Sequence, residues 1–547
     1  MAEPLTPVEE EMFPALTGHQ IDRIKPLTQP RDFADGAILW ESGDRNRPLF
    51  VILEGAVEIL LGSEVAVTVP KKGAFTGDVD LLSGHAVVSR GRAVGATRLL
   101  ELPAAGLRTL VQNDPELSAI FLRVFLLRRA SLVDREGKNV VLIGSTWCAA
   151  TLALREFLTR NNQPYKYLDA EADARVQATL DSFGVTAGDV PIVICRGTQV
   201  LRKATIERVA DCLGLSDLDE SVVRDLVVIG AGPAGLSAAV YAASEGLDVL
   251  VLEKYAPGGQ AGGSSRIENY LGFPTGVSGL ELARLALVQA EKFGAEMTVA
   301  RTTSSLGCDS PYRVEIGTAA GIRARAVIIA SGVRYRKPEI AELPRFEGLG
   351  VYYAATAVEG QLCSGEEVIV VGGGNSAGQA AVFLSGVARR VIMMVRRDAL
   401  AERMSRYLVR RIEGTANIEI MARTQITDLQ GAHRLDRVTW RGPGGEKTAS
   451  VRHVFLMTGA DPNTAWLGGC VALDDQGFVK TGPDLDAAAL AAAHWPLQRP
   501  PHLFETSRPG VFAIGDVRAG SVKRVAAAVG EGAICVQLVH RVLSEAS

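Results

Sequence analysis

The sequence predicts a multidomain α/β protein with an N-terminal β-roll, a small α/β domain and two doubly wound α/β domains. Its length of 547 residues suits about three or four domains of ordinary size. Short alternating strands broken by glycines fill residues 30–102, which is the pattern of a small roll or barrel. Two later segments, 226–253 and 368–395, each join an apolar strand to a helix through a glycine turn, as in a βαβ unit.

Composition and charge narrow the classes of partner. The formal net charge is -4 and no basic tract occurs, so the sequence disfavours nucleic acid as a partner. The acidic N-terminus lacks the features of a signal peptide, and we expect a cytoplasmic protein with no membrane partner. Seven cysteines are scattered without a CxxC pair or a zinc spacing, which favours a reducing compartment and predicts no metal site. They are Cys148, Cys195, Cys212, Cys308, Cys363, Cys470 and Cys535.

The N-terminal third carries a characteristic pattern of glycines and strands. Gly36, Gly43 and Gly55, with the segments 49–52 and 77–82, resemble the cyclic-nucleotide-binding domain family. The resemblance implies a β-roll domain over residues 1–136, closed by a helix.

In that family an acid holds the ribose and an arginine holds the cyclic phosphate. The acid position falls on Asp78, but the arginine position falls on Val88. A phosphate monoanion without its guanidinium loses its strongest contact, so the sequence disfavours a cyclic nucleotide as the ligand. Two alternatives stay open: Arg90, two residues along on the same strand face, supplies the contact, or the β-roll serves docking or regulation.

Residues 137–215 alternate between apolar strands and helices. The helices are expected at residues 151–161, 174–183 and 205–213. This layout, with Pro191 ahead of a buried strand, resembles the glutaredoxin and thioredoxin fold. The resemblance places Cys148 at the nucleophile position and Thr151 at that of the resolving cysteine. Because a helix start favours a thiolate, Cys148 is the candidate catalytic residue; the alternative is a buried remnant without a second thiol.

The segment 226–253 contains the first dinucleotide cradle. Gly230 permits a tight bend, Gly232 lets the backbone approach a pyrophosphate, and Gly235 lets the helix pack on the strand. Glu253 ends the second strand, where a carboxylate can accept a hydrogen bond from a ribose hydroxyl. The sequence therefore predicts a dinucleotide whose phosphates face the helix N-terminus.

Further segments surround this cradle in the order and spacing of the thioredoxin-reductase family. They are 258–260, 267–270, 272–274, 330–332 and 510–516. The resemblance implies a Rossmann-like domain, split as residues 222–338 and 464–547, that binds FAD. The FAD-binding residues so expected are Gly230, Gly232, Pro233, Ala234, Gly235, Glu253, Gly259, Gln260, Asn269, Ala330, Ser331, Gly332, Gly515, Asp516, Lys523, Arg524 and Val525.

The second cradle ends in arginines where the first ends in an acid. Arg396 and Arg397 follow its second strand. A carboxylate suits a free ribose hydroxyl whereas arginines suit a 2′-phosphate, so we expect NADPH here, with NADH as the alternative. The domain is expected over residues 339–463. Its NADPH-binding residues are expected to be Gly372, Gly374, Asn375, Ser376, Ala377, Arg396 and Arg397.

The redox dithiol of the resembling family is missing. That family carries Cys-Ala-Thr-Cys and an acid just before the second cradle, and this chain has Ala354, Ala357 and Val358 at the matching positions. Alanine forms neither a thiolate nor a mixed disulfide, which excludes thioredoxin reduction through this site. We expect Cys363, several residues later, to be a packing residue rather than a replacement thiol.

Together these patterns predict an FAD-dependent NAD(P)H oxidoreductase. A hydride passes from NADPH to FAD, and the electrons then leave to an unidentified acceptor, which is a protein disulfide, an electron carrier or a small oxidant. Two alternatives stay open: a redox or nucleotide sensor with little turnover, and an NADPH-driven disulfide reductase that relays electrons through Cys148. The resembling family also implies a homodimer.

Overall fold

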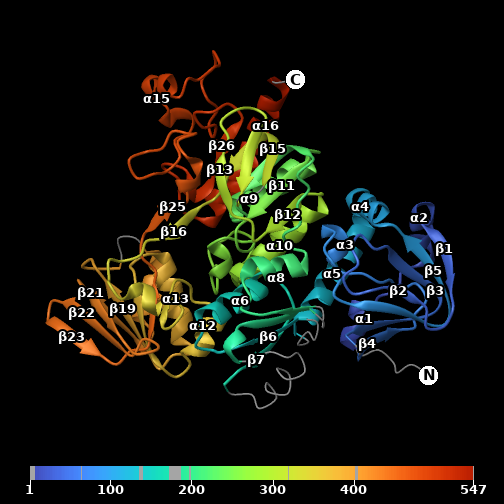
Figure 1. Ribbon diagram of the computed structural model, residues 1–547, viewed down its shortest axis with the longest axis horizontal. Helices are drawn as coiled ribbons and strands as arrows, with labels where there is room; N and C mark the ends of the chain where they lie inside the picture. The colour runs from blue at the N-terminus through green and yellow to red at the C-terminus, as the bar shows by residue number, and fades with distance from the viewer. Residues whose placement is uncertain are drawn as a thin grey trace. The chain divides into compact units, whose positions relative to one another are not determined.

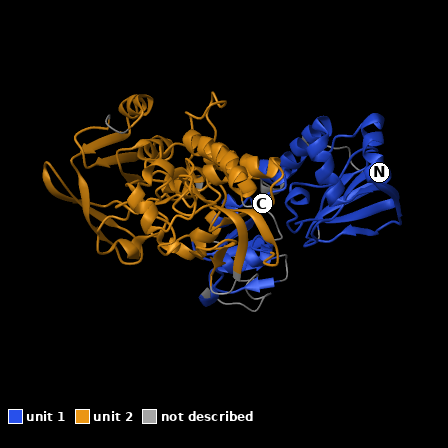
Figure 2. Ribbon diagram, turned by 90° about the horizontal axis from the view of Figure 1, so that it is seen from above, with its two compact units in different colours: residues 1–145, 157–218, 288–300 blue, residues 146–156, 219–287, 301–547 orange. Residues whose placement is uncertain are grey.

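The computed structural model describes residues 7–62, 64–134, 140–171, 187–195, 199–317, 320–400 and 404–545. They divide into two compact units (Figure 2). Unit 1 contains residues 1–145, 157–218 and 288–300, and unit 2 contains residues 146–156, 219–287 and 301–547. The domain ranges expected above stay predictions, and the expected helix at 174–183 lies outside the described residues.

The N-terminal part of unit 1 is a β-roll (Figure 1). Its sheet has the order β1-β5-β3-β4 with β2 also paired to β5, and all these pairs are antiparallel. Phe75 and Phe121 pack edge to face in its core with ring centroids 4.8 Å apart. The strands are β1 (Gln29–Phe33), β2 (Ile38–Trp40), β3 (Leu49–Leu61), β4 (Glu64–Val69) and β5 (Arg90–Leu102), and the helices are α1 (Pro7–Met12), α2 (Gly18–Ile24), α3 (Asp80–Ser83), α4 (Ala104–Asn113) and α5 (Pro115–Asp134).

A four-stranded sheet follows in unit 1, with the order β7-β6-β8-β9. Strand β6 pairs in parallel with β7 and antiparallel with β8, whose four residues are all buried. The last helix begins where expected, because the Thr205 hydroxyl accepts a hydrogen bond from the Arg208 N–H and caps its first turn. The elements here are β6 (Val140–Gly144), β7 (Lys166–Asp169), β8 (Ile192–Cys195), β9 (Gln199–Leu201) and α8 (Ile206–Leu213), together with α6 (Ala149–Arg160), whose residues 149–156 belong to unit 2.

The first sheet of unit 2 carries the first glycine turn. Its strands include β11-β10-β15-β14-β13, and β26 pairs in parallel with β15. All five residues of β11 are buried, as expected for a parallel strand covered on both faces. The strands are β10 (Val223–Ile229), β11 (Val249–Glu253), β13 (Thr303–Leu306), β14 (Tyr312–Ile316), β15 (Ala320–Ile329) and β26 (Val511–Ala513), and the helices are α9 (Pro233–Ser244) and α16 (Val525–Glu545).

Helix α16 packs against α9. The Ser237 hydroxyl donates to the carbonyl of Val529 at 2.8 Å, and a Cβ on Gly532 would lie 2.6 Å from the carbonyl oxygen of Ala234. By length and composition α16 is the one helix among the described residues that is long and apolar enough to cross a membrane. Its close packing on α9 gives a second reason for that apolar composition.

The second sheet of unit 2 is parallel throughout, with the order β17-β24-β18-β19-β20. A three-stranded antiparallel sheet, β21-β22-β23, lies in the chain between β20 and β24 of the parallel sheet. The antiparallel pair β16-β25 lies on the two chain segments that join the first sheet of unit 2 to the second. The strands are β16 (Val333–Tyr335), β17 (Val351–Tyr352), β18 (Glu367–Val371), β19 (Arg390–Val395), β20 (Ile418–Ala422), β21 (Gln425–Gln430), β22 (Arg437–Gly442), β23 (Gly445–Ala449), β24 (His453–Leu456) and β25 (Ala460–Pro462). The remaining elements are α10 (Gly279–Lys292), β12 (Glu296–Val299), α11 (Leu343–Phe346), α12 (Ala357–Leu362), α13 (Asn375–Ser385), α14 (Arg406–Glu413) and α15 (Ala487–Ala492).

Candidate functional site

The three glycines of the first cradle have different surroundings. Gly230 has φ 105°, and a Cβ there would overlap the carbonyl oxygen of Ala330. A Cβ on Gly235 would overlap the carbonyl oxygen of Gly230, so the helix can approach the strand only through glycine. By contrast, no atom lies within 4 Å of the position that a Cβ on Gly232 would take. The cradle therefore fits a dinucleotide, because the open space lies where a pyrophosphate must approach.

Glu253 is held at the end of β11 beside this cradle. One carboxylate oxygen accepts the N–H of Ala231 at 2.7 Å, and the other accepts those of Tyr255 at 2.9 Å and Ala256 at 3.3 Å. A carboxylate has about four lone-pair sites, so this acid keeps one for a further donor. Its residual exposure of 9% is compatible with contact to a ribose hydroxyl.

The loop segments expected around FAD gather next to the first glycine turn. A Cβ on Gly259 would lie 3.0 Å from the Cα of Gly232, and the Gln260 side chain donates to the carbonyl of Val333. Ser331, between Ala330 and Gly332, exchanges two hydrogen bonds with Asn463 at 2.8 and 2.9 Å. Asn269 is exposed.

The C-terminal part of the expected FAD site is organised by a residue that the sequence pattern does not reveal. Glu531 on α16 accepts the N–H of Gly515 at 2.6 Å and pairs with Arg518 at 2.7 Å. Lys523, two residues before α16 begins at Val525, donates to the carbonyl of Asp516 at 3.0 Å. Burial is the main cause that raises the pKa of Asp516, with Lys523 opposing it. Glu531 lies 16 residues beyond Gly515, and no local spacing rule marks such a contact.

The second cradle repeats the first with a different charge at its end. Gly372 has φ 145°, and a Cβ there would overlap the carbonyl oxygen of Met457, whereas Gly374 faces open space. The Asn375 side chain accepts the N–H of Ser405 at 2.8 Å and fixes the start of α13. Arg396 and Arg397 are exposed directly after β19, so this cradle fits a dinucleotide that bears an extra phosphate. Ser376 hydrogen-bonds Tyr335 of β16, and Ala377 is buried.

The segment that lacks the dithiol lies beside the FAD-type loop. The Cβ of Ala354 is 3.6 Å from the position that a Cβ on Gly263 would take. Glu359 closes a capping box at the start of α12, because its carboxylate accepts the N–H of Thr356 at 2.9 Å. Cys363 is fully buried, and burial raises the pKa of its thiol to about 11. An unreactive packing thiol is what the sequence predicts for Cys363.

Cys148 is half-buried and directly precedes α6. Its neighbour Trp147 lies under the Arg434 guanidinium, 4.5 Å from the ring centroid. The Cβ of Ala149 is 2.9 Å from the Cβ position of Gly348. The structure thus places the Cys148 segment beside residues that shortly precede Ala354 in the chain. Thr151 is fully buried.

The β-roll contains a cavity, and the arginine side chains that line it are not the one expected from the sequence. Arg47 and Arg128 line it together with Asp78, and both guanidinium groups are buried. Arg90 instead pairs with Glu41 at 2.5 Å and is half-exposed. The alternative that Arg90 substitutes for the missing arginine is therefore not supported, because its side chain is already paired outside this cavity.

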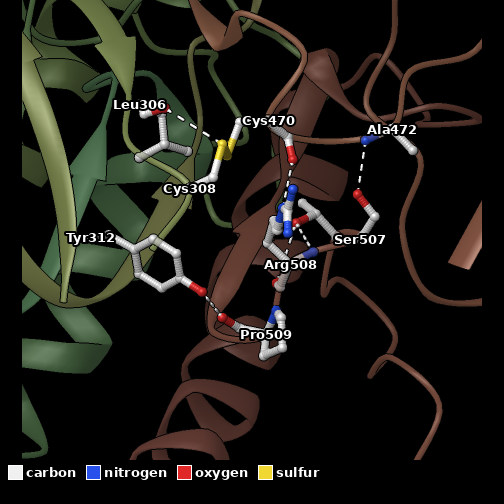
Figure 3. The surroundings of a disulfide bond; sticks show 9 residues. Leu306, Cys308, Tyr312, Cys470, Ala472, Ser507, Arg508 and Pro509 are labelled. Carbon is white, nitrogen blue, oxygen red and sulfur yellow. Dashed lines mark hydrogen bonds between the residues drawn. A yellow bond between two sulfur atoms is a disulfide. The ribbon is translucent and has the colours of Figure 1, made fainter. Parts of the chain in front are cut away.

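Four of the seven cysteines form disulfide bonds, which their scattered spacing does not indicate. Cys195 pairs with Cys212 across 17 residues, and Cys308 pairs with Cys470 across 162 residues. Figure 3 shows the second pair, where Arg508 donates to the carbonyl of Cys470 at 3.0 Å. The scattered cysteines therefore do not by themselves support the expected reducing compartment.

Two cradles on successive sheets, one ending in an acid and one in paired arginines, define a flavin- and pyridine-nucleotide-dependent oxidoreductase. Comparison with known proteins agrees with this class. Residues 224–532 match the pyridine nucleotide-disulphide oxidoreductase family, and the chain belongs to that family. It is an FAD-dependent NAD(P)H oxidoreductase of the thioredoxin-reductase type. Residues 30–114 match the cyclic nucleotide-binding domain, which confirms the resemblance of the β-roll.

The relatives and solved structures cover about three fifths of the chain. The thioredoxin reductase of Bacillus subtilis (strain 168) is 30% identical over 335 residues, which make up 60% of this chain and 97% of that protein. The thioredoxin reductase of Treponema pallidum (strain Nichols) is 33% identical over 312 residues, or 57% of this chain and 94% of that protein. The crystal structure of Lactococcus lactis thioredoxin reductase matches with a TM-score of 0.52 and 27% identity, covering 59% of this chain and 99% of its own.

Proposed function

We propose that this chain oxidises NADPH and passes the electrons to an acceptor by a route that does not use a dithiol at residues 354–357. The observation that carries the proposal is the contrast between the two cradles, Glu253 in one and Arg396 with Arg397 in the other. This contrast supports FAD in the first cradle and NADPH in the second. The thioredoxin-like character of residues 137–215, the cytoplasmic location and the homodimer belong to the same proposal.

Each cradle has a role in this scheme. Gly232 would leave room for the FAD pyrophosphate, Glu253 would accept a hydrogen bond from its ribose, and Asp516 would hold the ribityl and phosphate region. Arg396 and Arg397 hold the 2′-phosphate of NADPH through charge-assisted hydrogen bonds. FAD bound in this way supplies the two-electron chemistry by accepting a hydride from NADPH.

The residues around Ala354 exclude one route by which electrons could leave the flavin. We propose that Ala354 and Ala357 stand where the resembling family has its two redox cysteines, beside the loop that includes Gly259 and Gln260. Neither alanine can take part in thiol exchange. Cys363 does not replace them, since burial keeps its thiol protonated and closed to solvent. The acceptor is a protein disulfide, an electron carrier or a small oxidant.

Cys148 is a second candidate route, and one observation favours it. Its neighbours Trp147 and Ala149 contact Arg434 and Gly348, so the thiol is held near the segment that leads to Ala354. A redox sensor with little turnover is the remaining alternative.

Rapid anaerobic mixing of the FAD-loaded protein with NADPH tests the proposed function. We expect the flavin absorbance near 450 nm to be lost at a rate of at least about 1 s⁻¹, in the range of ordinary turnover numbers. Replacing both Arg396 and Arg397 by glutamine should raise the NADPH concentration needed for half-maximal rate by about tenfold or more, with little change for NADH. Flavin that keeps its absorbance for minutes would contradict an enzyme and favour the sensor.

A further inference from the structure

The disulfide between Cys195 and Cys212 lies at the wall of an open cleft in unit 1. Cys195 is the last residue of β8 and is fully buried, whereas Cys212 on α8 is 8% exposed. Cys212 lines a cleft of about 680 Å³. Cys212 therefore borders the cleft whereas Cys195 does not, and this asymmetry is what an attacking thiol and a resolving thiol require.

The rest of the cleft carries both signs of charge. Arg45, Arg208, Asp211 and Asp217 line it, all of them at the surface. Arg45 pairs with Asp217 and also donates to the carbonyl of Gly214 at 3.2 Å, so the rim is tied to the turn after α8. Guanidinium groups suit a carboxylate and carboxylates suit an ammonium group. The cleft is thus complementary to a ligand that carries both groups.

Gln199 brings a polar group to the sulfur itself. Its side-chain amide oxygen lies 3.1 Å from the Sγ of Cys212. A 180° flip of the side-chain amide exchanges its oxygen and its NH₂ group, and in the flipped orientation the NH₂ group donates to this sulfur. Such a donor stabilises a thiolate on Cys212, so Gln199 is a positioning residue for the sulfur that borders the cleft.

We propose that Cys195 and Cys212 are a redox-active pair, and that the cleft binds a small disulfide whose halves each carry a carboxylate and an ammonium group. This inference rests on the proposed function, in which NADPH supplies two electrons that do not leave through residues 354–357. The small α/β domain then contains the dithiol that the segment around Ala354 lacks.

The exchange balances in two steps. In the reduced pair, the Cys212 thiolate attacks one sulfur of the substrate disulfide RSSR, the S–S bond of RSSR breaks, and one RS⁻ leaves and takes up a proton. The Cys195 thiolate then attacks the Cys212 sulfur, the mixed disulfide breaks, and the second RS⁻ leaves. This RS⁻ also takes up a proton, and the pair is oxidised again. The two electrons that NADPH supplies, with H⁺, then break the Cys195–Cys212 bond and restore the two thiols, so the net reaction is NADPH + H⁺ + RSSR → NADP⁺ + 2 RSH.

Alkylation of the full-length FAD-loaded protein tests the pair directly. After anaerobic incubation with NADPH, we expect mass spectrometry to find Cys195 and Cys212 alkylated, while Cys308 and Cys470, the matched control, stay oxidised. Loss of flavin absorbance with Cys195 and Cys212 still oxidised overturns the inference and leaves the proposed function intact. If the flavin is not reduced, the proposed function fails. Titration with dithiothreitol then tests the pair separately, by showing whether the Cys195–Cys212 bond is reduced before the Cys308–Cys470 bond.

NADPH oxidation with L-cystine as the probe tests the substrate class. Cys212→Ser should lower the cystine-dependent rate by at least about 100-fold, because the attacking thiol is lost. The rate at which NADPH removes the flavin absorbance should stay normal and shows that the variant is folded. Cys308→Ser with Cys470→Ser should retain cystine turnover. Loss of turnover in Cys148→Ser, with Cys212→Ser active, would transfer the role to Cys148 and overturn the inference.

The charged rim is tested by comparing two disulfides. Arg208→Glu should raise the KM for L-cystine by about tenfold, as expected for one lost charge-assisted contact. The KM for uncharged 2-hydroxyethyl disulfide should stay the same. Equal changes for both substrates, or no preference of the unaltered protein for cystine, would refute the assigned ligand chemistry.

Discussion

At the scale of single residues, adding a methyl group at one of two glycines of the first cradle should affect either ligand binding alone or ligand binding and folding together. Gly232 faces open space, so a Cβ there meets nothing in the protein but occupies the approach of a pyrophosphate. Gly235 faces the carbonyl oxygen of Gly230, so a Cβ there displaces α9 from β10.

We predict that Gly232→Ala loses most of its bound FAD while the apoprotein melts within about 1 °C of the unaltered apoprotein. Gly235→Ala should lose FAD and also destabilise the apoprotein by about 1–3 kcal/mol, because overpacking shifts the backbone. Flavin absorbance of the purified proteins and thermal unfolding of the apoproteins measure the two effects. Normal FAD content in Gly232→Ala would show that the open space is not the pyrophosphate site.

At the scale of elements, the contact between α9 and α16 offers two glycines on one helix with opposite surroundings. A Cβ on Gly532 would lie 2.6 Å from the Ala234 carbonyl oxygen, whereas a Cβ on Gly530 meets nothing within 4 Å. Gly532→Ala should therefore destabilise the protein by about 1–3 kcal/mol. Gly530→Ala, the matched control, should stabilise it by up to about 1 kcal/mol because alanine favours a helix. Denaturant unfolding followed by circular dichroism compares the two; equal effects would mean that α16 does not pack as described.

The elements also show what the sequence can and cannot predict. The cradles are predictable because a glycine turn between an apolar strand and a helix is a local pattern, and their strands end at Glu253 and Val395, next to the expected charges. The contact of Glu531 with Gly515 depends on how α16 folds back over the sheet. The Cys308–Cys470 bond joins segments 162 residues apart, and no spacing rule reaches that far.

At the scale of the whole molecule, a buried acid makes stability depend on pH. Glu291 on α10 is 5% exposed, and burial, with a smaller contribution from Asp80, raises its pKa to about 8, while Arg129 opposes the shift. Between the ordinary glutamate value of about 4.3 and pH 8, the folded protein holds a proton that the unfolded chain has released. The free energy of unfolding is therefore unaffected by this group below that ordinary value. As pH rises through the window, the group lowers the free energy of unfolding by at most about 1.4 kcal/mol per pH unit.

We predict that the melting temperature falls between pH 6 and pH 8.5, and that Glu291→Gln flattens this slope because an amide does not titrate. Some slope should remain, since burial also raises the pKa of Asp80, to about 7. Glu281→Gln, on the same helix but with its half-exposed carboxylate paired to Arg284, should keep the slope of the unaltered protein. Calorimetry across this pH range checks the three proteins; a steeper fall in Glu291→Gln would contradict the assignment.

The course of α10 bears on how such a chain can be shortened during evolution. The helix begins at Gly279 in unit 2, and its last turns belong to unit 1, where Val288 joins the hydrophobic cluster of Phe75 and Phe121. A gene trimmed to encode only the reductase-like part would leave this valine and the protonated Glu291 without their surroundings. Loss of the N-terminal domains would therefore require compensating substitutions on α10, and a descendant that carries only the C-terminal part should have polar residues at both positions.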